Sequence, residues 1–128
     1  MMLAAMKILS DTKAGAVLVK SGDLNVIGDM TADILSQRGM QPMEILHRRI
    51  NTRNTHGTGC SLSTAIGCGL ACGLTLEEAV RQGIDLIVKG IEGGRDFKLG
   101  KGRGPINFFA INSGTIEKQE KEDEDNDK

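Results

Sequence analysis

Hydrophobic and polar positions along this chain repeat with different periods, and each period predicts a different element. Residues 1–9 are mostly good helix formers with an apolar side chain at every third position, which predicts a helix or the end of a longer one. Residues 16–19 are all apolar and lie between Gly15 and Lys20. A continuous apolar run of this length predicts a buried strand of the kind found in parallel sheets.

The middle of the chain carries two further strand patterns and one helix pattern. Residues 32–39 and 43–50 are separated by a turn and predict two short strands, although the first pattern also fits a turn of helix. In residues 57–72, small and apolar side chains occur on every side of the helix axis. A helix without a polar face is expected to be buried, so we predict a buried helix here.

A second helix pattern follows directly. Thr75 and Glu78 have the spacing of a capping box, and apolar residues then keep a helical spacing as far as Gly93. Residues 95–107 are polar and rich in glycine, which predicts a loop. Strands followed by two helices predict an α/β layered fold.

Composition and charge divide the chain into a body and a tail. The whole chain has 128 residues and a net charge of −1. Its last residues, 117–128, contain seven acids, three bases and no apolar side chain, so they cannot bury surface to offset the entropy of ordering. We therefore predict one domain over residues 1–112 and an acidic disordered tail over residues 113–128. The mildly cationic body suits a small anionic ligand.

Residue usage argues against several classes of function. The chain has no Trp, no Tyr and no basic run, which argues against a nucleic-acid partner. No apolar stretch reaches the ~20 residues of a membrane span, and the first residues do not resemble a signal peptide. Three cysteines are an odd number, which is typical of free thiols in a reducing compartment. We therefore expect a cytoplasmic protein that does not bind membranes.

Candidate chemistry is concentrated where a glycine-rich turn meets a helix start. Gly57, Thr58 and Gly59 place unpaired backbone N–H groups at the helix N-terminus, which attracts anions such as phosphate, although many such turns bind nothing. Cys60 follows at the same terminus, where a thiol ionises more readily and can act as a base or nucleophile. The alternatives are simple packing of the Cys60 thiol and a zinc site with His56 and the other two cysteines, which the spacing disfavours.

The stretch NTHGTGCSLSTAIG, residues 54–67, resembles the signature of the hydroxymethylpyrimidine and phosphomethylpyrimidine kinases, a branch of the ribokinase-like superfamily. The segments GAVLVKSGDL, LTLEEAVRQG and GKGRGPINFF extend the similarity, which covers residues 1 to 109. It implies the C-terminal half of a ribokinase-like layered α/β fold with a mainly parallel sheet. Ser21, Asp23 and Arg103 depart from the family pattern.

The resemblance also implies an activity. The family phosphorylates hydroxymethylpyrimidine or its monophosphate in thiamine biosynthesis, which implies ATP and Mg²⁺ as cofactors and a small pyrimidine as the substrate. Cys60 is then the expected catalytic residue. Lys20, Asn54, Thr55 and the turn of residues 57–59 are expected to bind the phosphates of ATP, and no residue is assigned as a metal ligand.

Because the resemblance covers only half of the family's domain, a second interpretation of the chain's function remains open. The chain could be a non-catalytic fragment or partner module that keeps only the nucleotide half-site. Without the N-terminal half of the domain, the strand at residues 16–19 is expected to leave a sheet edge open. We therefore expect the chain to associate with itself or with a separate N-terminal half.

Overall fold

The protein is described here by a computed structural model that places residues 1–22 and 26–111. The acidic tail predicted for residues 113–128 lies outside the described residues. In chain order, the elements are α1 (Met2–Asp11), β1 (Ala16–Val19), β2 (Met30–Gln37), β3 (Met43–Arg48), α2 (Thr58–Ala71), α3 (Leu76–Gly94) and one turn of 3₁₀ helix, η1 (Phe108–Ala110). This is an α/β fold, as the sequence predicts.

The three described strands form an antiparallel sheet in the order β1-β2-β3. The prediction of a mainly parallel sheet is therefore not confirmed. The physical reason lies in the connections: β2 and β3 are joined by residues 38–42 alone, whereas parallel neighbours need a crossover of a dozen or more residues. In the described part of the chain β1 has β2 on one side only, so its apolar run is half-buried.

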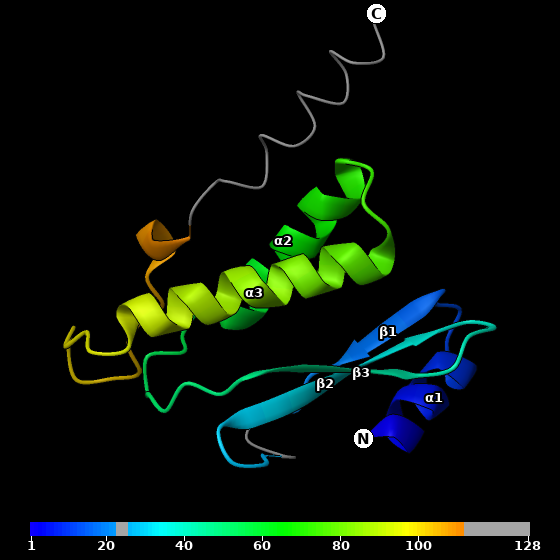
Figure 1. The fold of residues 1–128 in the computed structure, drawn as a ribbon, viewed down its shortest axis with the longest axis horizontal. Coiled ribbons are helices and arrows are strands. Elements are labelled where there is room, and N and C mark those ends of the chain that lie inside the picture. The colour runs from blue at the N-terminus through cyan, green and yellow to red at the C-terminus, as the bar shows by residue number, and fades with distance from the viewer. Residues whose placement is uncertain (23–25, 112–128) are drawn as a thin grey trace, which may run out of the picture.

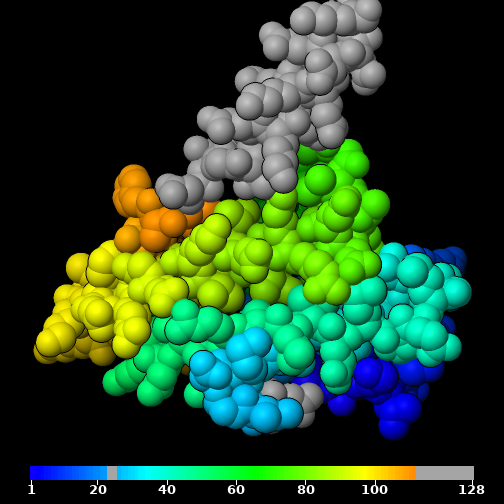
Figure 2. Space-filling model, in the orientation of Figure 1, coloured from blue at the N-terminus to red at the C-terminus, as the bar shows by residue number. Residues whose placement is uncertain are grey.

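Helices cover both faces of this sheet. α1 lies against one face, and α2 with α3 lies on the other (Figure 1). Six consecutive residues of the central strand, 31–36, are buried because both of its faces are covered. In the space-filling view, the atoms of α3 lie directly against those of β3 and the residues after it (Figure 2).

α2 and α3 pack closely because small residues lie at their contact. A Cβ atom added at Gly83 would lie 3.1 Å from Leu62 Cδ1, and one added at Gly69 would lie 3.0 Å from the Cβ of Ala79. α3 begins with the predicted capping box: the Glu78 N–H donates to the Thr75 hydroxyl and the Thr75 N–H donates to the Glu78 carboxylate. The predicted bounds of both helices are correct to within a residue.

The prediction that α2 is buried is wrong. Only Leu62 and Gly69 of this helix are buried, and Cys60, Cys68 and Cys72 are all exposed. One face of α2 packs on α3, and no element among the described residues covers the opposite face. The exposed residues of α2 are mostly small, with Leu70 as a larger apolar exception, so composition alone did not show that this face would be exposed.

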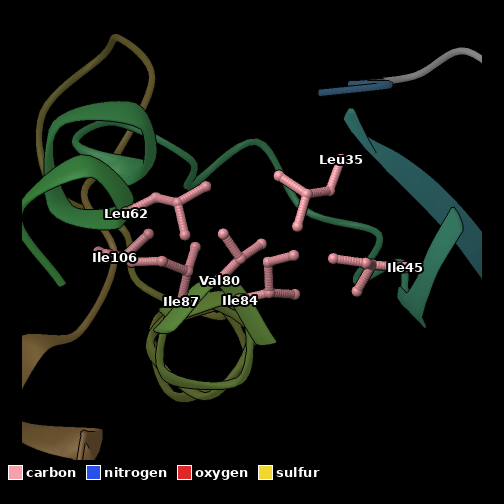
Figure 3. Close-up of a cluster of buried hydrophobic side chains, with 7 residues drawn as sticks. All are labelled: Leu35, Ile45, Leu62, Val80, Ile84, Ile87 and Ile106. Atoms are coloured by element: carbon pink, nitrogen blue, oxygen red, sulfur yellow. The ribbon is translucent and has the colours of Figure 1, made fainter. Parts of the chain in front are cut away.

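The core lies between the sheet and the two long helices. Seven buried side chains meet there, from β2, β3, α2, α3 and the loop before η1 (Figure 3): Leu35, Ile45, Leu62, Val80, Ile84, Ile87 and Ile106. Burial of this aliphatic cluster fixes α3 over the sheet. Among residues 1–22 and 26–111, no helix combines the length and the hydropathy needed to cross a membrane.

Candidate functional site

A cavity of about 310 Å³ opens beside this core, between the sheet and the two long helices. One wall is apolar and is formed mainly by α2 and α3, from Leu62, Ile84, Ile87, Val88 and Ile91. The other wall is polar and comes from the ends of the strands and from the loops that follow them. A ligand that fills this cavity therefore needs an apolar part and a polar part.

The charged side chains around the cavity are mostly cationic. Lys20, Arg48, Arg49 and Arg103 line it, and Asp33 is the one carboxylate among the described lining residues. Arg48 also lies 3.5 Å from Glu92 on the exposed surface. The excess of positive charge suits an anionic group such as a phosphate.

Lys20 follows β1 directly, and its side chain lines the cavity. Thr55 and Thr58 line the cavity as well. The structure therefore brings together three of the residues predicted to bind phosphate, from two segments far apart in the sequence. Gly59 and Cys60 are exposed and are not part of the cavity lining.

The N-terminus of α2 has the geometry expected of a glycine turn. Gly57 is the N-cap residue with φ of 93°, a left-handed conformation that favours glycine. The Thr58 N–H donates to Thr55 O and the Ser61 N–H donates to Gly57 O. Within the part of the chain that the structure describes, the N–H groups of Gly59 and Cys60 have no acceptor, so they are available to an anion.

Asn54 has a structural role that the sequence did not indicate. Its side chain is buried, and Nδ2 donates to Gly94 O and to Phe97 O, both at 2.8 Å. These bonds tie the end of α3 to the loop before α2. A Cβ atom at Gly104 would collide with the Asn54 side chain, so only glycine fits there.

The glycine-rich loop at residues 95–107 is joined to this entrance. The His56 N–H donates to Gly104 O at 3.0 Å, and the Ile106 N–H donates to His56 O at 3.3 Å. These bonds form a short parallel bridge between His56 and Pro105. The loop that the sequence predicts is therefore held beside the start of α2, with Arg103 at the cavity.

Sequence reasoning missed a polar cluster on the sheet side of the cavity. Asp33 on β2 accepts a bond from the Ser21 N–H at 2.9 Å and one from His47 Nε2 at 3.1 Å. Ser21 Oγ lies 2.6 Å from Thr31 Oγ1. One signal was available in the sequence: an acid at position 33 interrupts an apolar strand, and such an acid needs partners if it is buried.

The pKa values of this pair are displaced in opposite directions. Burial alone raises the pKa of Asp33, but the hydrogen bonds from His47 and Ser21 and the nearby positive charge outweigh burial and lower it. The hydrogen bond to Asp33 raises the pKa of His47 against the opposing effect of burial. Both shifts favour a carboxylate paired with an imidazolium.

Comparison with known proteins gives the family. Residues 1–107 match the family model described as phosphomethylpyrimidine kinase. The chain belongs to the phosphomethylpyrimidine kinase family.

Relatives in this family are longer than the chain. It is 42% identical over 98 residues to the hydroxymethylpyrimidine/phosphomethylpyrimidine kinase of Rhizobium meliloti, which covers 77% of this chain and 36% of that protein. It is 36% identical to the thiamine biosynthetic bifunctional enzyme TH1 of Arabidopsis thaliana, over 84% of this chain and 20% of that enzyme. The chain thus spans about a third of the Rhizobium relative.

Solved structures show the same fold. A pyridoxal kinase of Bacillus subtilis in an ADP complex superposes with a TM-score of 0.74 at 28% identity, over 85% of this chain and 39% of that one. A pyridoxal kinase of Staphylococcus aureus in complex with AMP-PCP and pyridoxal gives a TM-score of 0.75 at 24% identity, over 86% of this chain and 39% of that one. The chain therefore has part of the ribokinase-like α/β fold that the resemblance implied.

Proposed function

We propose that this chain supplies the ATP-binding and phosphoryl-transfer part of a kinase that phosphorylates hydroxymethylpyrimidine or its monophosphate in thiamine biosynthesis. The observation that carries the proposal is the cavity, which combines cationic side chains, an apolar wall and the adjacent N-terminus of α2. Membership of the phosphomethylpyrimidine kinase family supplies the substrate class.

Each part of the site has a task in this reaction. Lys20 and the free N–H groups of Gly59 and Cys60 bind the ATP phosphates, and they stabilise the charge that develops during transfer. Thr55 and Thr58 add hydroxyl groups from the cavity wall. Asn54 contributes by holding the entry loop in place. Cys60 accepts the proton of the substrate hydroxyl or phosphate as general base.

Mg²⁺ is expected with ATP, and it neutralises charge on the transferring phosphoryl group when bound. The described residues do not offer it a ligand set. No cluster of three or more His, Cys, Asp or Glu side chains occurs among them, and the Asp33 carboxylate already bonds through both oxygens. We propose that the metal is held mainly through the phosphates of the nucleotide.

We propose that the pyrimidine substrate also contacts protein outside the matched region. The matched residues cover 36% of the Rhizobium relative, so nearly two thirds of that relative's length has no matched counterpart here. We propose that a second polypeptide or a second copy completes the site. The same coverage supports one alternative, a module that binds nucleotide without catalysing transfer. The odd number of cysteines, three, supports a reducing compartment such as the cytoplasm.

Calorimetry with Mg·ATP on the purified chain tests the nucleotide site. Wild type is expected to bind, and Lys20→Met is expected to bind about tenfold more weakly, because a charge-assisted bond to phosphate is lost. Lys89→Met is the matched control, since Lys89 is an exposed lysine of α3 that does not line the cavity. Absence of ATP binding by wild type, or equal loss in both variants, would count against the proposed function.

A further inference from the structure

The polar cluster on the sheet side of the cavity lies immediately beside Lys20. Ser21 and Asp33 are 3% and 2% exposed, so this cluster is part of the folded interior and not a surface network. Both residues line the cavity, as do Thr31 and His47. None of the roles assigned above to the phosphate-binding groups uses this cluster.

Asp33 fixes the backbone next to Lys20. On one side of Lys20, Val19 is paired with Ile34 in the sheet register. On the other side, the Ser21 N–H donates to Asp33 Oδ1 at 2.9 Å. The backbone is therefore held on both sides of the lysine, and the root of its side chain cannot move away from the cavity unless one of these pairings breaks.

His47 occupies the second oxygen of the same carboxylate. Its Nε2 donates to Asp33 Oδ2 at 3.1 Å, and its Nδ1 lies 3.3 Å from the carbonyl oxygen of Arg48. A carboxylate and a carbonyl both accept hydrogen bonds and cannot donate them. Only the imidazolium form, with a proton on each nitrogen, satisfies both contacts.

The protonation state of His47 changes the charge that the cavity presents. With His47 protonated, the charge of Asp33 is balanced, and no unbalanced carboxylate among the described lining residues opposes the positive charge of Lys20 and Arg103. With His47 neutral, the Asp33 carboxylate repels phosphate and attracts the ammonium group of Lys20. The side chains that α3 turns to the cavity are apolar. The α3 carboxylate of Glu92 lies 3.5 Å from Arg48, so it offsets the charge of that arginine whatever the protonation state of His47.

We propose that Asp33 and His47 form a positioning pair that holds Lys20 for phosphate binding and makes nucleotide binding respond to the protonation of His47. The inference rests on the proposed function, because it names the groups that regulate the same nucleotide site. Asp33 and His47 act through Lys20 and the local charge and do not touch the reacting atoms.

The test measures Mg·ATP affinity by calorimetry from about pH 6 to about pH 9, a range that includes the ordinary imidazole pKa of about 6.5 and the region above it. Wild type is expected to bind about threefold to tenfold more weakly at the upper end, the effect of one partly exposed charge. His47→Gln keeps an N–H donor for Asp33 but cannot be charged, so its affinity is expected to stay at the high-pH level throughout. Titration of the nucleotide itself affects both proteins equally.

A second measurement follows the ring nitrogens of His47 by NMR, with His47→Gln identifying its signals against those of His56. The midpoint of the His47 titration is expected to coincide with the midpoint of the ATP affinity change, and Asp33→Asn is expected to move both to lower pH together. Lys89→Gln, which removes one distant positive charge, is the control and should leave the midpoint unchanged.

The possible outcomes separate the two proposals. ATP binding that is independent of pH in wild type, or that keeps its pH dependence in His47→Gln, overturns the positioning pair and leaves the nucleotide site standing. Two midpoints that differ in wild type overturn the pair, and if His47→Gln fails to fold, His56→Gln identifies the His47 signals by difference. Absence of ATP binding at every pH overturns the nucleotide site and the pair together.

Discussion

Single residues in this chain serve the site mostly through what they hold in place. Asn54 ties the end of α3 to the loop before α2, and Asp33 fixes the backbone after Lys20. Both are buried polar side chains, which are costly unless their partners are present. Their substitution is therefore expected to change stability as well as ligand binding, and the two effects can be measured separately.

The Asp33 and His47 pair predicts how stability depends on pH. Folding raises the pKa of His47 above its ordinary 6.5. Protonated His47 therefore stabilises the folded state fully below pH 6.5, and this stabilisation is lost as pH rises through the raised pKa. The pKa of Asp33 is lowered below its ordinary 3.8, so its effect is complete above that pH and is lost as pH falls further. Thermal melts should show the pair's largest contribution between these values. A His47→Gln chain with the same loss of stability above neutral pH would contradict the assignment.

The proposed role of the Cys60 thiol as general base can be tested by substitution. If its thiol is the general base, Cys60→Ser should lower turnover by about 10²–10⁴ and leave ATP affinity unchanged, because the backbone N–H groups of α2 remain. Turnover is measured with the chain joined to the part of the Rhizobium relative that it lacks. Cys72→Ala, an exposed cysteine near the other end of α2, is the control. Full activity of Cys60→Ser would leave the thiol without a catalytic role.

The buried amide of Asn54 gives a prediction of stability. Asn54→Ala removes the donor to Gly94 O and Phe97 O and leaves two buried carbonyl groups with fewer partners. The free energy of unfolding should fall by about 1–3 kcal/mol in denaturant titrations. Thr64→Ala, on the exposed face of α2, is a control that should change stability by far less. An equal effect in both variants would argue against this role for Asn54.

At the scale of elements, signals between sequence neighbours predict the helices, whereas the pairing of strands depends on residues far apart in the sequence. Thr75 and Glu78 marked the start of α3, because a capping box depends only on neighbours in the sequence. The parallel neighbour expected for β1 is not confirmed, because an apolar run of four residues indicates burial and does not specify which strand lies beside it. The Asp33 and His47 contact was missed for the same reason, since strand register brings together residues fourteen positions apart.

Substitution by alanine is expected to change the free energy of unfolding in opposite directions at two glycines, Gly94 and Gly67. A Cβ at Gly94 would lie 2.9 Å from Asn107 N and 3.1 Å from Pro105 O, both backbone atoms that cannot move alone. Gly94→Ala should therefore destabilise the chain by about 1–3 kcal/mol. A Cβ at Gly67, on the exposed face of α2, meets nothing within 4 Å. Gly67→Ala should stabilise by up to about 1 kcal/mol through helix propensity. Urea unfolding of both variants checks the sign, and stabilisation by Gly94→Ala would refute the packing argument.

At the scale of the whole molecule, several small and apolar side chains of the described residues are exposed. The uncovered face of α2 carries Cys60, Ser63, Gly67 and Cys68, which are small enough for another element to approach closely. Leu3 of α1 is also 82% exposed. Apolar and small surfaces of this kind are typical of interfaces. Composition did not decide between burial and exposure of this face, because small residues occur on both kinds of helix surface.

The last prediction concerns that face. Sedimentation at micromolar concentration should show that the isolated chain self-associates. When the part of the Rhizobium relative that this chain does not match is added, sedimentation should show a defined complex. Gly67→Trp places a large side chain where nothing lies within 4 Å, so the chain alone should keep its thermal unfolding while the complex is lost. Lys89→Trp, on the exposed side of α3, should leave the complex intact. A compact wild-type monomer that ignores the added part would show that the face of α2 is an ordinary solvent surface.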